Sequence, residues 1–151
     1  MILIATDGSA PARAAEALGL ELARARGTTP AFVCVWAPLR GSFGVPLPEA
    51  VHPEFLDAER TWAEETLAAA AGRAAAAGLE AETIIAKGPA VQGVCDTAER
   101  RRAGMVVIGS HGWGAMMSLI FGSTTLGVLQ HAPCPVVVVR DDPAGSAEAP
   151  A

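Results

Sequence analysis

The chain has 151 residues, the size of one ordinary domain, and 51% of them are hydrophobic while 18% are charged. That balance is typical of a compact folded protein and excludes an intrinsically disordered chain. The formal net charge of −5 repels polyanions, so we expect no nucleic-acid partner. No apolar run reaches the ~18 residues of a membrane span, and the start of the sequence lacks the basic residues of a signal peptide. Three widely spaced cysteines without ligand spacing fit core thiols, and we therefore expect a cytoplasmic protein with no membrane partner.

The first third of the chain predicts a strand, a helix and a second strand. Residues 2–6 form a continuous apolar run, typical of a strand buried on both faces, and the turn residues Asp7, Gly8 and Ser9 follow it. A helix is expected up to Gly27 because apolar residues recur at steps of three and four: Ala15, Leu18, Leu22 and Ala25. Residues 31–36 read as another buried strand. The Pro- and Gly-rich stretch 38–53 leaves the carboxyl end of that strand, where a flap over a site would lie.

The rest of the chain continues the alternation of helices and strands. Helices are predicted over 54–77, from Gly88 and Pro89 onward, and over 124–131, and strands over 79–86, 105–109 and 135–139. The helix after Pro89 should turn four residues inward: Val91, Val94, Cys95 and Ala98. We expect a single domain over 1–140, followed by a disordered tail over 141–151 that is small, polar and Pro-containing.

Five strands alternating with four helices predict an α/β fold. The sheet should be mainly parallel, with helices on both faces, because consecutive parallel strands need helical crossovers. The strand order 3-2-1-4-5, half of a dinucleotide-binding fold, is the favoured arrangement, and 2-1-3-4-5 is the competing one.

Two glycine-containing loops then fall side by side. In open α/β sheets a ligand binds beyond the carboxyl ends of the strands, where the strand order reverses. For order 3-2-1-4-5 this point brings Asp7 next to the stretch GSHGWGAMMSLIFGSTT, residues 109–125. Its glycines let the backbone approach a ligand, and Gly122-Ser123-Thr124 stands at a helix start, where free N–H groups attract phosphate. The alternative is that Ser123 or Thr124 is only an N-cap and the glycines are only turns.

The spacing of these glycines resembles that of a known family. Gly109-Ser110-His111-Gly112, nine residues, and then Gly122-Ser123 fit the pattern G-x2-G-x9-G-[S/T] of the ATP-binding branch of the universal stress protein family. ILIATDGS at the start, KGPA at 87–90 and PCPVVVV near the end also resemble that family, so the likeness covers nearly the whole chain. The resemblance implies a Rossmann-like fold, similar to the adenine nucleotide alpha hydrolases, and a regulatory or stress-response role.

The resemblance also implies a set of site residues. Asp7 would lie at the nucleoside end and Val35 would offer backbone contacts to adenine. The nucleoside would be lined by Ile108, Gly109 and His111, and the phosphates held by Gly112, Gly122, Ser123 and Thr124. The ligand would be ATP, or ADP or AMP, with Mg²⁺ as a possible bridging ion. Elementary electrostatics supports the placement of Asp7 at the nucleoside end, because a carboxylate repels phosphate and suits ribose hydroxyls, an amine or a metal ion.

One departure leaves the number of phosphates open. No Lys or Arg occurs from Ser110 to Ala132, and Trp113 lies beside Gly112, so backbone N–H groups and Mg²⁺ would have to neutralise a triphosphate. Lys87 or Arg40 are the cations that could fold over the phosphates.

The sequence leaves three functions open. The sequence supplies no paired carboxylates and no nucleophile with a base near the site, so binding is favoured over turnover. The alternatives are a slow ATPase or nucleotidyl- or phosphoryl-transfer enzyme, and a dimeric interaction module that binds no nucleotide. The last strand would be an uncharged edge, and both this edge and the resemblance predict a homodimer through Val136, Val137, Val138 and Val139.

Overall fold

A five-stranded parallel sheet forms the centre of the molecule. The computed structural model describes residues 1–36, 53–112 and 121–140. The strands are β1 (Ile2–Ala5), β2 (Pro30–Trp36), β3 (Glu82–Lys87), β4 (Met105–Gly109) and β5 (Val136–Val139). Their order is β3-β2-β1-β4-β5, and every pairing is parallel. The predicted order 3-2-1-4-5 is therefore confirmed and the alternative 2-1-3-4-5 is wrong.

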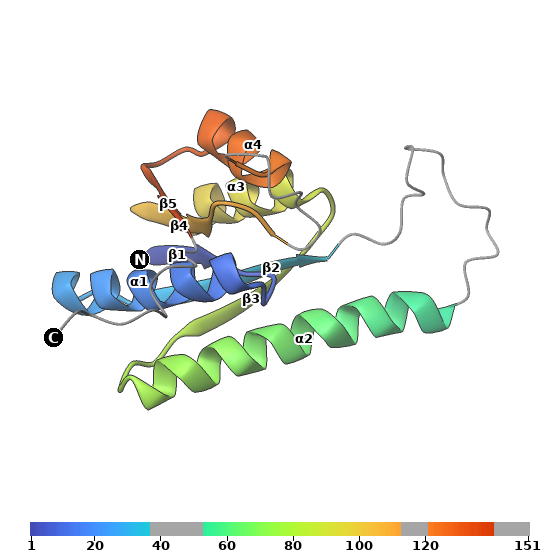
Figure 1. Cartoon of the computed structure of the whole chain (residues 1–151), viewed down its shortest axis with the longest axis horizontal. Helices are drawn as coiled ribbons and strands as arrows, with labels where there is room; N and C mark the ends of the chain where they lie inside the picture. Colours follow the sequence, from blue (N-terminus) through green and yellow to red (C-terminus); the bar gives the residue numbers. More distant parts are fainter. Residues whose placement is uncertain (37–52, 113–120, 141–151) are drawn as a thin grey trace, which may run out of the picture.

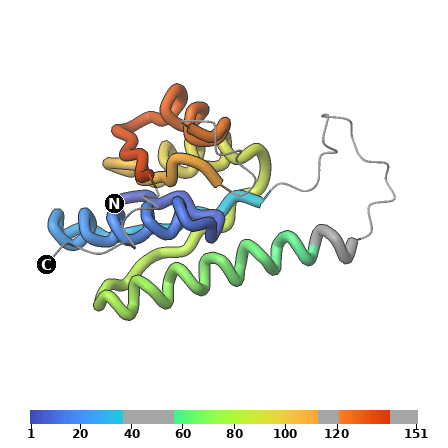
Figure 2. The backbone as a smooth tube through the Cα atoms, in the orientation of Figure 1, coloured from blue at the N-terminus to red at the C-terminus, as the bar shows by residue number. Residues whose placement is uncertain are grey.

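Two helices cover each face of the sheet (Figure 1). Helices α1 (Ala10–Arg26) and α2 (Pro53–Ala76) lie on one face, and α3 (Ala90–Arg100) and α4 (Ser123–His131) on the other. Each face has its own apolar cluster: Phe32 is central to the first, and Val33, its neighbour in β2, belongs to the second. The tube in Figure 2 follows the chain from one layer to the other as strands and helices alternate.

Helix α1 ends at Gly27, as the sequence predicts, and most of the residues on its buried side are small. Ser9 accepts the Ala12 N–H at 3.3 Å as the N-cap, and Gly27 ends the helix in the left-handed conformation, with φ at 60°. The buried side includes Ala12, Ala15, Glu16, Gly19, Leu20 and Ala23. Of the four residues whose spacing indicated this helix, Ala15 is buried, Leu22 is half-buried against the first cluster, Leu18 is half-buried and Ala25 is exposed.

The small residues allow a close approach of α1 to the sheet. A Cβ atom added to Gly19 would lie 2.6 Å from Ile4 Cδ1, so any larger residue would force the buried Ile4 side chain to move. Small residues of α1 therefore face the strands at this point. The larger Leu18 and Leu22, whose spacing indicated the helix, flank this contact.

Strand β3 begins three residues later than predicted. The sequence placed its start at residue 79, whereas the strand runs from Glu82. Leu79 instead completes the end of α2: its N–H donates to Ala74 O at 2.9 Å, and its side chain packs against the first cluster. This is a common way to close a helix, with Gly78 in the left-handed region at φ 72°.

The remaining predictions concern cysteines, membranes and the segments outside the described residues. Cys34 is buried, and the half-buried Cys95 and Cys134 pack against the second cluster. None of the described helices is both long and apolar enough to cross a bilayer. The expected flap over 38–53, apart from its last residue at the start of α2, and the expected tail over 141–151 lie outside the described residues.

Candidate functional site

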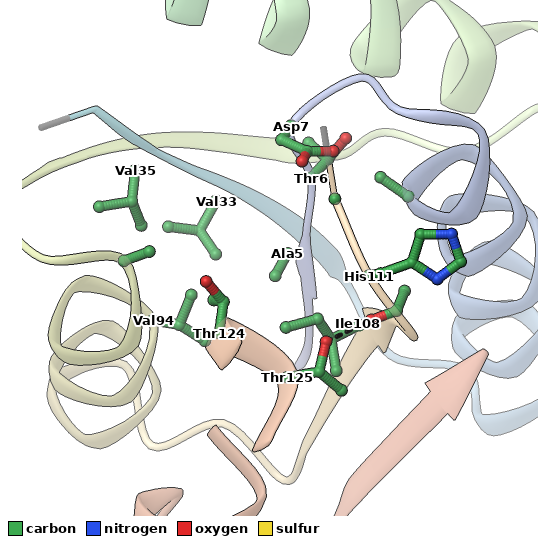
Figure 3. A pocket seen from close by; sticks show the side chains of 14 residues that line it. Ala5, Thr6, Asp7, Val33, Val35, Val94, Ile108, His111, Thr124 and Thr125 are labelled. Atoms are coloured by element: carbon green, nitrogen blue, oxygen red, sulfur yellow. Dashed lines mark hydrogen bonds between the residues drawn. The ribbon is translucent and has the colours of Figure 1, made fainter. Parts of the chain in front are cut away.

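A cleft opens at the carboxyl ends of β1, β2 and β4, where the strand order reverses (Figure 3). This is the place at which open α/β sheets bind ligands. Residues from all three strands line it, together with the loops that follow β1 and β4 and the first turns of α1, α3 and α4. The lining residues are Ala5, Thr6, Asp7, Ala12, Val33, Val35, Ala90, Val94, Ile108, Gly109, His111, Gly112, Thr124 and Thr125.

One wall of the cleft is apolar. Val33 and Val35 of β2 stand beside Val94 of α3, and Ala5 and Ile108 continue the surface. Val35 is held from behind by α3, because a Cβ atom added to Gly93 would lie 2.6 Å from its Cγ1 atom. The wall is thus a fixed, uncharged surface of the kind that receives a flat heterocycle.

The opposite rim is the turn between β1 and α1, which carries Asp7. Gly8 adopts φ 77°, and its N–H donates to Thr6 Oγ1 at 3.2 Å. The Ser9 N–H donates to Asp7 Oδ1 at 3.0 Å, so one carboxylate oxygen shapes the turn. The other oxygen lies against Gly112, where an added Cβ atom would overlap it.

The loop after β4 crosses closely over the start of α1. A Cβ atom on Gly109 would lie 2.7 Å from the carbonyl carbon of Pro11, so glycine is required there. Next in the chain, Ser110 Oγ and His111 Nδ1 lie 3.0 Å apart, within hydrogen-bond distance. In Figure 3 the His111 ring is turned toward α1 and away from Val33 and Val35. The ring therefore points away from the valine wall.

The amino end of α4 is bound tightly to this loop. Gly122 is the N-cap of the helix, and no side chain caps it, so the alternative that Ser123 or Thr124 serves as N-cap is wrong. The Gly122 N–H donates to Ser110 O at 2.8 Å, and Thr125 Oγ1 donates to Gly109 O at 2.8 Å. Among the described residues no side chain caps the first turn, and its N–H groups and positive dipole end are directed to this side of the cleft.

The sequence-predicted site residues are brought together with two exceptions. Seven of them line the cleft: Asp7, Val35, Ile108, Gly109, His111, Gly112 and Thr124. Gly122 and Ser123 stand just outside the lining, where an added Cβ on Gly122 would be 3.2 Å from His111 Cα. Trp113, and the apolar stretch 116–121 except for Phe121, lie outside the described residues.

Sequence reasoning missed several lining residues, above all Thr6, Val33 and Thr125. Val33 was identifiable in principle, because side chains two apart in a strand share a face and Val35 was already chosen. Thr6 directly follows β1 and Thr125 lies inside α4. The spacing of residues in the sequence therefore does not mark either threonine as part of a site.

The charge inside the cleft is sparse. Among the described lining residues, Asp7 and His111 are the ionisable ones, and no group of three possible metal ligands occurs in the described part of the chain. Beneath the turn, burial, and then the negative charge of Asp7, raises the pKa of the Cys34 thiol to about 12. The thiol is therefore neutral, and it is a packing group and not a nucleophile.

Comparison with known proteins gives a consistent set of relatives. Residues 1–140 match the model of the universal stress protein family. A universal stress protein of Thermus aquaticus is 31% identical over 140 residues, covering 92% of this chain and 97% of that protein. One from Mycobacterium tuberculosis is 33% identical over 148 residues, and the match covers 95% of this chain but 50% of that longer protein.

Solved structures share the fold. The universal stress protein UspA from Lactobacillus plantarum has a TM-score of 0.81 at 26% identity, covering 92% of this chain and 96% of its own. A universal stress protein in complex with cAMP has a TM-score of 0.70 at 22% identity, covering 93% and 97%. An Arabidopsis thaliana family member with AMP bound has a TM-score of 0.70 at 17% identity, covering 97% and 94%.

Proposed function

The chain belongs to the universal stress protein family, and from that premise we propose that its cleft binds an adenine nucleotide and that the protein acts as a cytoplasmic regulatory module. The observation that carries the proposal is the pairing of an uncharged valine wall with a helix start whose N–H groups are capped by no side chain of the described residues. A base suits the first surface and a phosphate the second. The structural neighbours solved with cAMP and with AMP support the same ligand class.

The proposed ligand lies across the ends of the strands. Adenine rests on Val33 and Val35, with the backbone of Val35 reading its edge. Asp7 and the backbone of Ile108, Gly109 and His111 hold the ribose. The phosphate reaches the start of α4, where it contacts Gly112, Gly122, Ser123 and Thr124. Because Asp7 Oδ2 lies against Gly112, its negative charge is kept from the phosphate only when the phosphate stays close to the start of α4.

The number of phosphates follows from the sparse charge. No Lys or Arg belongs to the described lining, so backbone N–H groups are the cleft's own means of stabilising an anion. These backbone N–H groups suit a ligand with one phosphate. ADP and ATP need more neutralisation, and we propose that Mg²⁺ bridging their phosphates supplies it. ATP binding should therefore depend on Mg²⁺ more strongly than AMP binding.

The proposal is for binding and not for turnover. Asp7 already accepts the Ser9 N–H at 3.0 Å, and the His111 ring is turned toward α1. Neither group is aimed at a phosphate as a general base. Phosphate release from Mg-ATP, measured with and without the protein, should be equal, and a catalysed release would favour the slow ATPase.

The experiment asks what the purified protein retains. Native mass spectrometry after gentle purification should detect the chain with a bound adenine nucleotide. Gly122→Val should lose this ligand, because its Cβ would meet His111 Cα at 3.2 Å and push the loop into the cleft. Gly72→Val is the matched control, since nothing lies within 4 Å of that position. An empty cleft together with no binding of added adenine nucleotides would support the interaction module instead.

A further inference from the structure

A carboxylate is buried beneath the cleft, on the side of the sheet that α1 and α2 cover. Glu16 of α1 is 1% exposed, an unusual environment for a charged side chain, which persists only when both oxygens have partners. Two different elements supply them. Thr6 Oγ1 donates to Glu16 Oε1 at 2.5 Å, and Arg73 Nε of α2 donates to Glu16 Oε2 at 2.6 Å.

The Thr6 hydroxyl links Glu16 to the turn that carries Asp7. A hydroxyl has one proton to donate and lone pairs to accept with. Because its proton is directed to Glu16, a lone pair faces the Gly8 N–H, which donates to it at 3.2 Å. Gly8 sits at φ 77° directly after Asp7. The carboxylate thus fixes the direction of the hydroxyl, and the hydroxyl fixes the backbone that carries Asp7.

We propose that Glu16 is a positioning residue of the nucleotide cleft: acting through Thr6, it holds the turn in the shape that presents Asp7 to the ligand. This inference rests on the proposed function of the cleft. Glu16 does not line the cleft itself, so it acts on the ligand through the turn alone.

Helix α2 belongs to the same support although none of its described residues lines the cleft. The Arg73 side chain is 41% exposed, so its guanidinium neutralises the buried carboxylate at one end and meets water at the other. Thr66 of α2 packs directly on the turn, since a Cβ atom on Gly8 would lie 3.5 Å from its Cγ2 atom. The turn is therefore held between the end of β1 and α2.

The test combines an affinity measurement with a readout from the free protein. Calorimetric titration with AMP should give a dissociation constant about tenfold higher for Thr6→Val and for Glu16→Gln than for the unchanged protein, the cost of losing one well-placed hydrogen bond. Thr6→Val removes the donor, and Glu16→Gln leaves one acceptor oxygen for two donors, of which the charged Arg73 keeps it, so that an amide NH2 group faces Thr6. Thr6→Ser keeps the hydroxyl and should restore the affinity. In the ligand-free protein, the NMR amide signals of Gly8 and Ser9 should shift in Thr6→Val and Glu16→Gln but stay in place in Thr6→Ser.

A control variant separates this role from general stability. Glu64→Gln breaks another carboxylate–guanidinium contact on α2, the exposed pair with Arg60 at 2.9 Å, and should change neither the affinity nor the turn signals. All titrations are made where circular dichroism shows the variants folded, so a loss of stability alone leaves the dissociation constant unchanged.

The outcomes of these experiments distinguish the positioning role of Glu16 from the proposed nucleotide binding. If the unchanged protein binds AMP and both Thr6→Val and Glu16→Gln bind it equally well, the positioning role is overturned while the nucleotide site stands. Equal weakening in Thr6→Ser and Thr6→Val overturns it as well, because the hydroxyl would then not matter. If the unchanged protein binds no adenine nucleotide, the proposed function fails and the positioning role fails with it.

Discussion

At the scale of single residues, the cleft depends on glycines that let parts of the backbone meet. Gly109 lets the loop after β4 cross over Pro11, and Gly112 leaves room for the Asp7 carboxylate. Neither has a positive φ, so the close contacts and not an unusual backbone conformation explain these two glycines. The positions of these glycines in the sequence thus correspond to the places where neighbouring segments approach each other.

Gly112→Ala should weaken nucleotide binding with little effect on folding. The new methyl group would overlap Asp7 Oδ2, so the carboxylate must leave its place at the rim. We expect AMP affinity to fall about tenfold or more, and the free energy of unfolding to change by less than about 1 kcal/mol. Calorimetry and urea denaturation measure the two quantities.

Gly72→Ala is the matched control for that substitution. Nothing lies within 4 Å of the added methyl group, and alanine in a helix is favoured over glycine by about 0.5–1 kcal/mol. This variant should be slightly more stable and bind AMP normally. An unchanged affinity in Gly112→Ala would show that Asp7 does not contact the ligand from its present place.

Cys34 predicts a decrease in stability at high pH. Burial and Asp7 raise its pKa from 9.0 to about 12. Between these values the unfolded chain has lost the thiol proton while the native protein keeps it, so stability falls as pH rises, by up to about 1.4 kcal/mol per pH unit from this group. Urea midpoints from pH 8.5 to 10.5 should therefore fall more steeply for the unchanged protein than for Cys34→Ala. Parallel slopes would contradict the buried, neutral thiol.

At the scale of helices and strands, much of the fold was predictable because its signals are local. Apolar runs indicated four of the five strands and an alternating pattern indicated β3, and Gly27 and Gly78 marked helix ends that the structure confirms. The start of β3 was not predictable, since Leu79 looks like a strand residue but packs at the end of α2. Glu16 was missed for a similar reason: its partners Thr6 and Arg73 are 10 and 57 residues away, and no sequence spacing connects them.

Thr125 should be essential for docking α4 on the sheet. It is 2% exposed, and its hydroxyl donates to the carbonyl of Gly109 at the end of β4. Thr125→Val leaves that carbonyl without its donor and should cost about 1–3 kcal/mol of unfolding free energy. Thr125→Ser retains the hydrogen bond and should cost clearly less. Urea denaturation of the two variants measures the difference, and equal losses would mean that the methyl group and not the hydroxyl stabilises the contact.

At the scale of the whole molecule, β5 is an open edge of the sheet. Its four valines are only half-buried in the single chain, and an uncharged edge favours pairing with another chain. Pro135 O and Val139 O accept hydrogen bonds from β4, at 2.9 and 2.7 Å. Because backbone groups alternate along a strand, Val137 also faces β4, and Val138 faces the open edge.

Val138→Pro should abolish the proposed homodimer and leave the monomer folded. The substitution removes an N–H from the open edge, where proline is tolerated. Sedimentation velocity at micromolar concentration should change from dimer to monomer, with an unaltered circular dichroism spectrum. Val137→Pro is the comparison, since it removes an N–H that faces β4 and should destabilise the fold itself. A Val138→Pro protein that remains dimeric would rule out pairing through β5.

The central claim is that the cleft recognises both adenine and phosphate, and calorimetric titration with AMP tests it most directly. Adenosine and ribose 5-phosphate each supply one half of the ligand, and GMP changes only the base. We expect one AMP bound per chain, with weaker binding of each of the other three compounds. Absence of binding by AMP to folded protein that has been freed of retained ligand, or equal binding of AMP and ribose 5-phosphate, would contradict it.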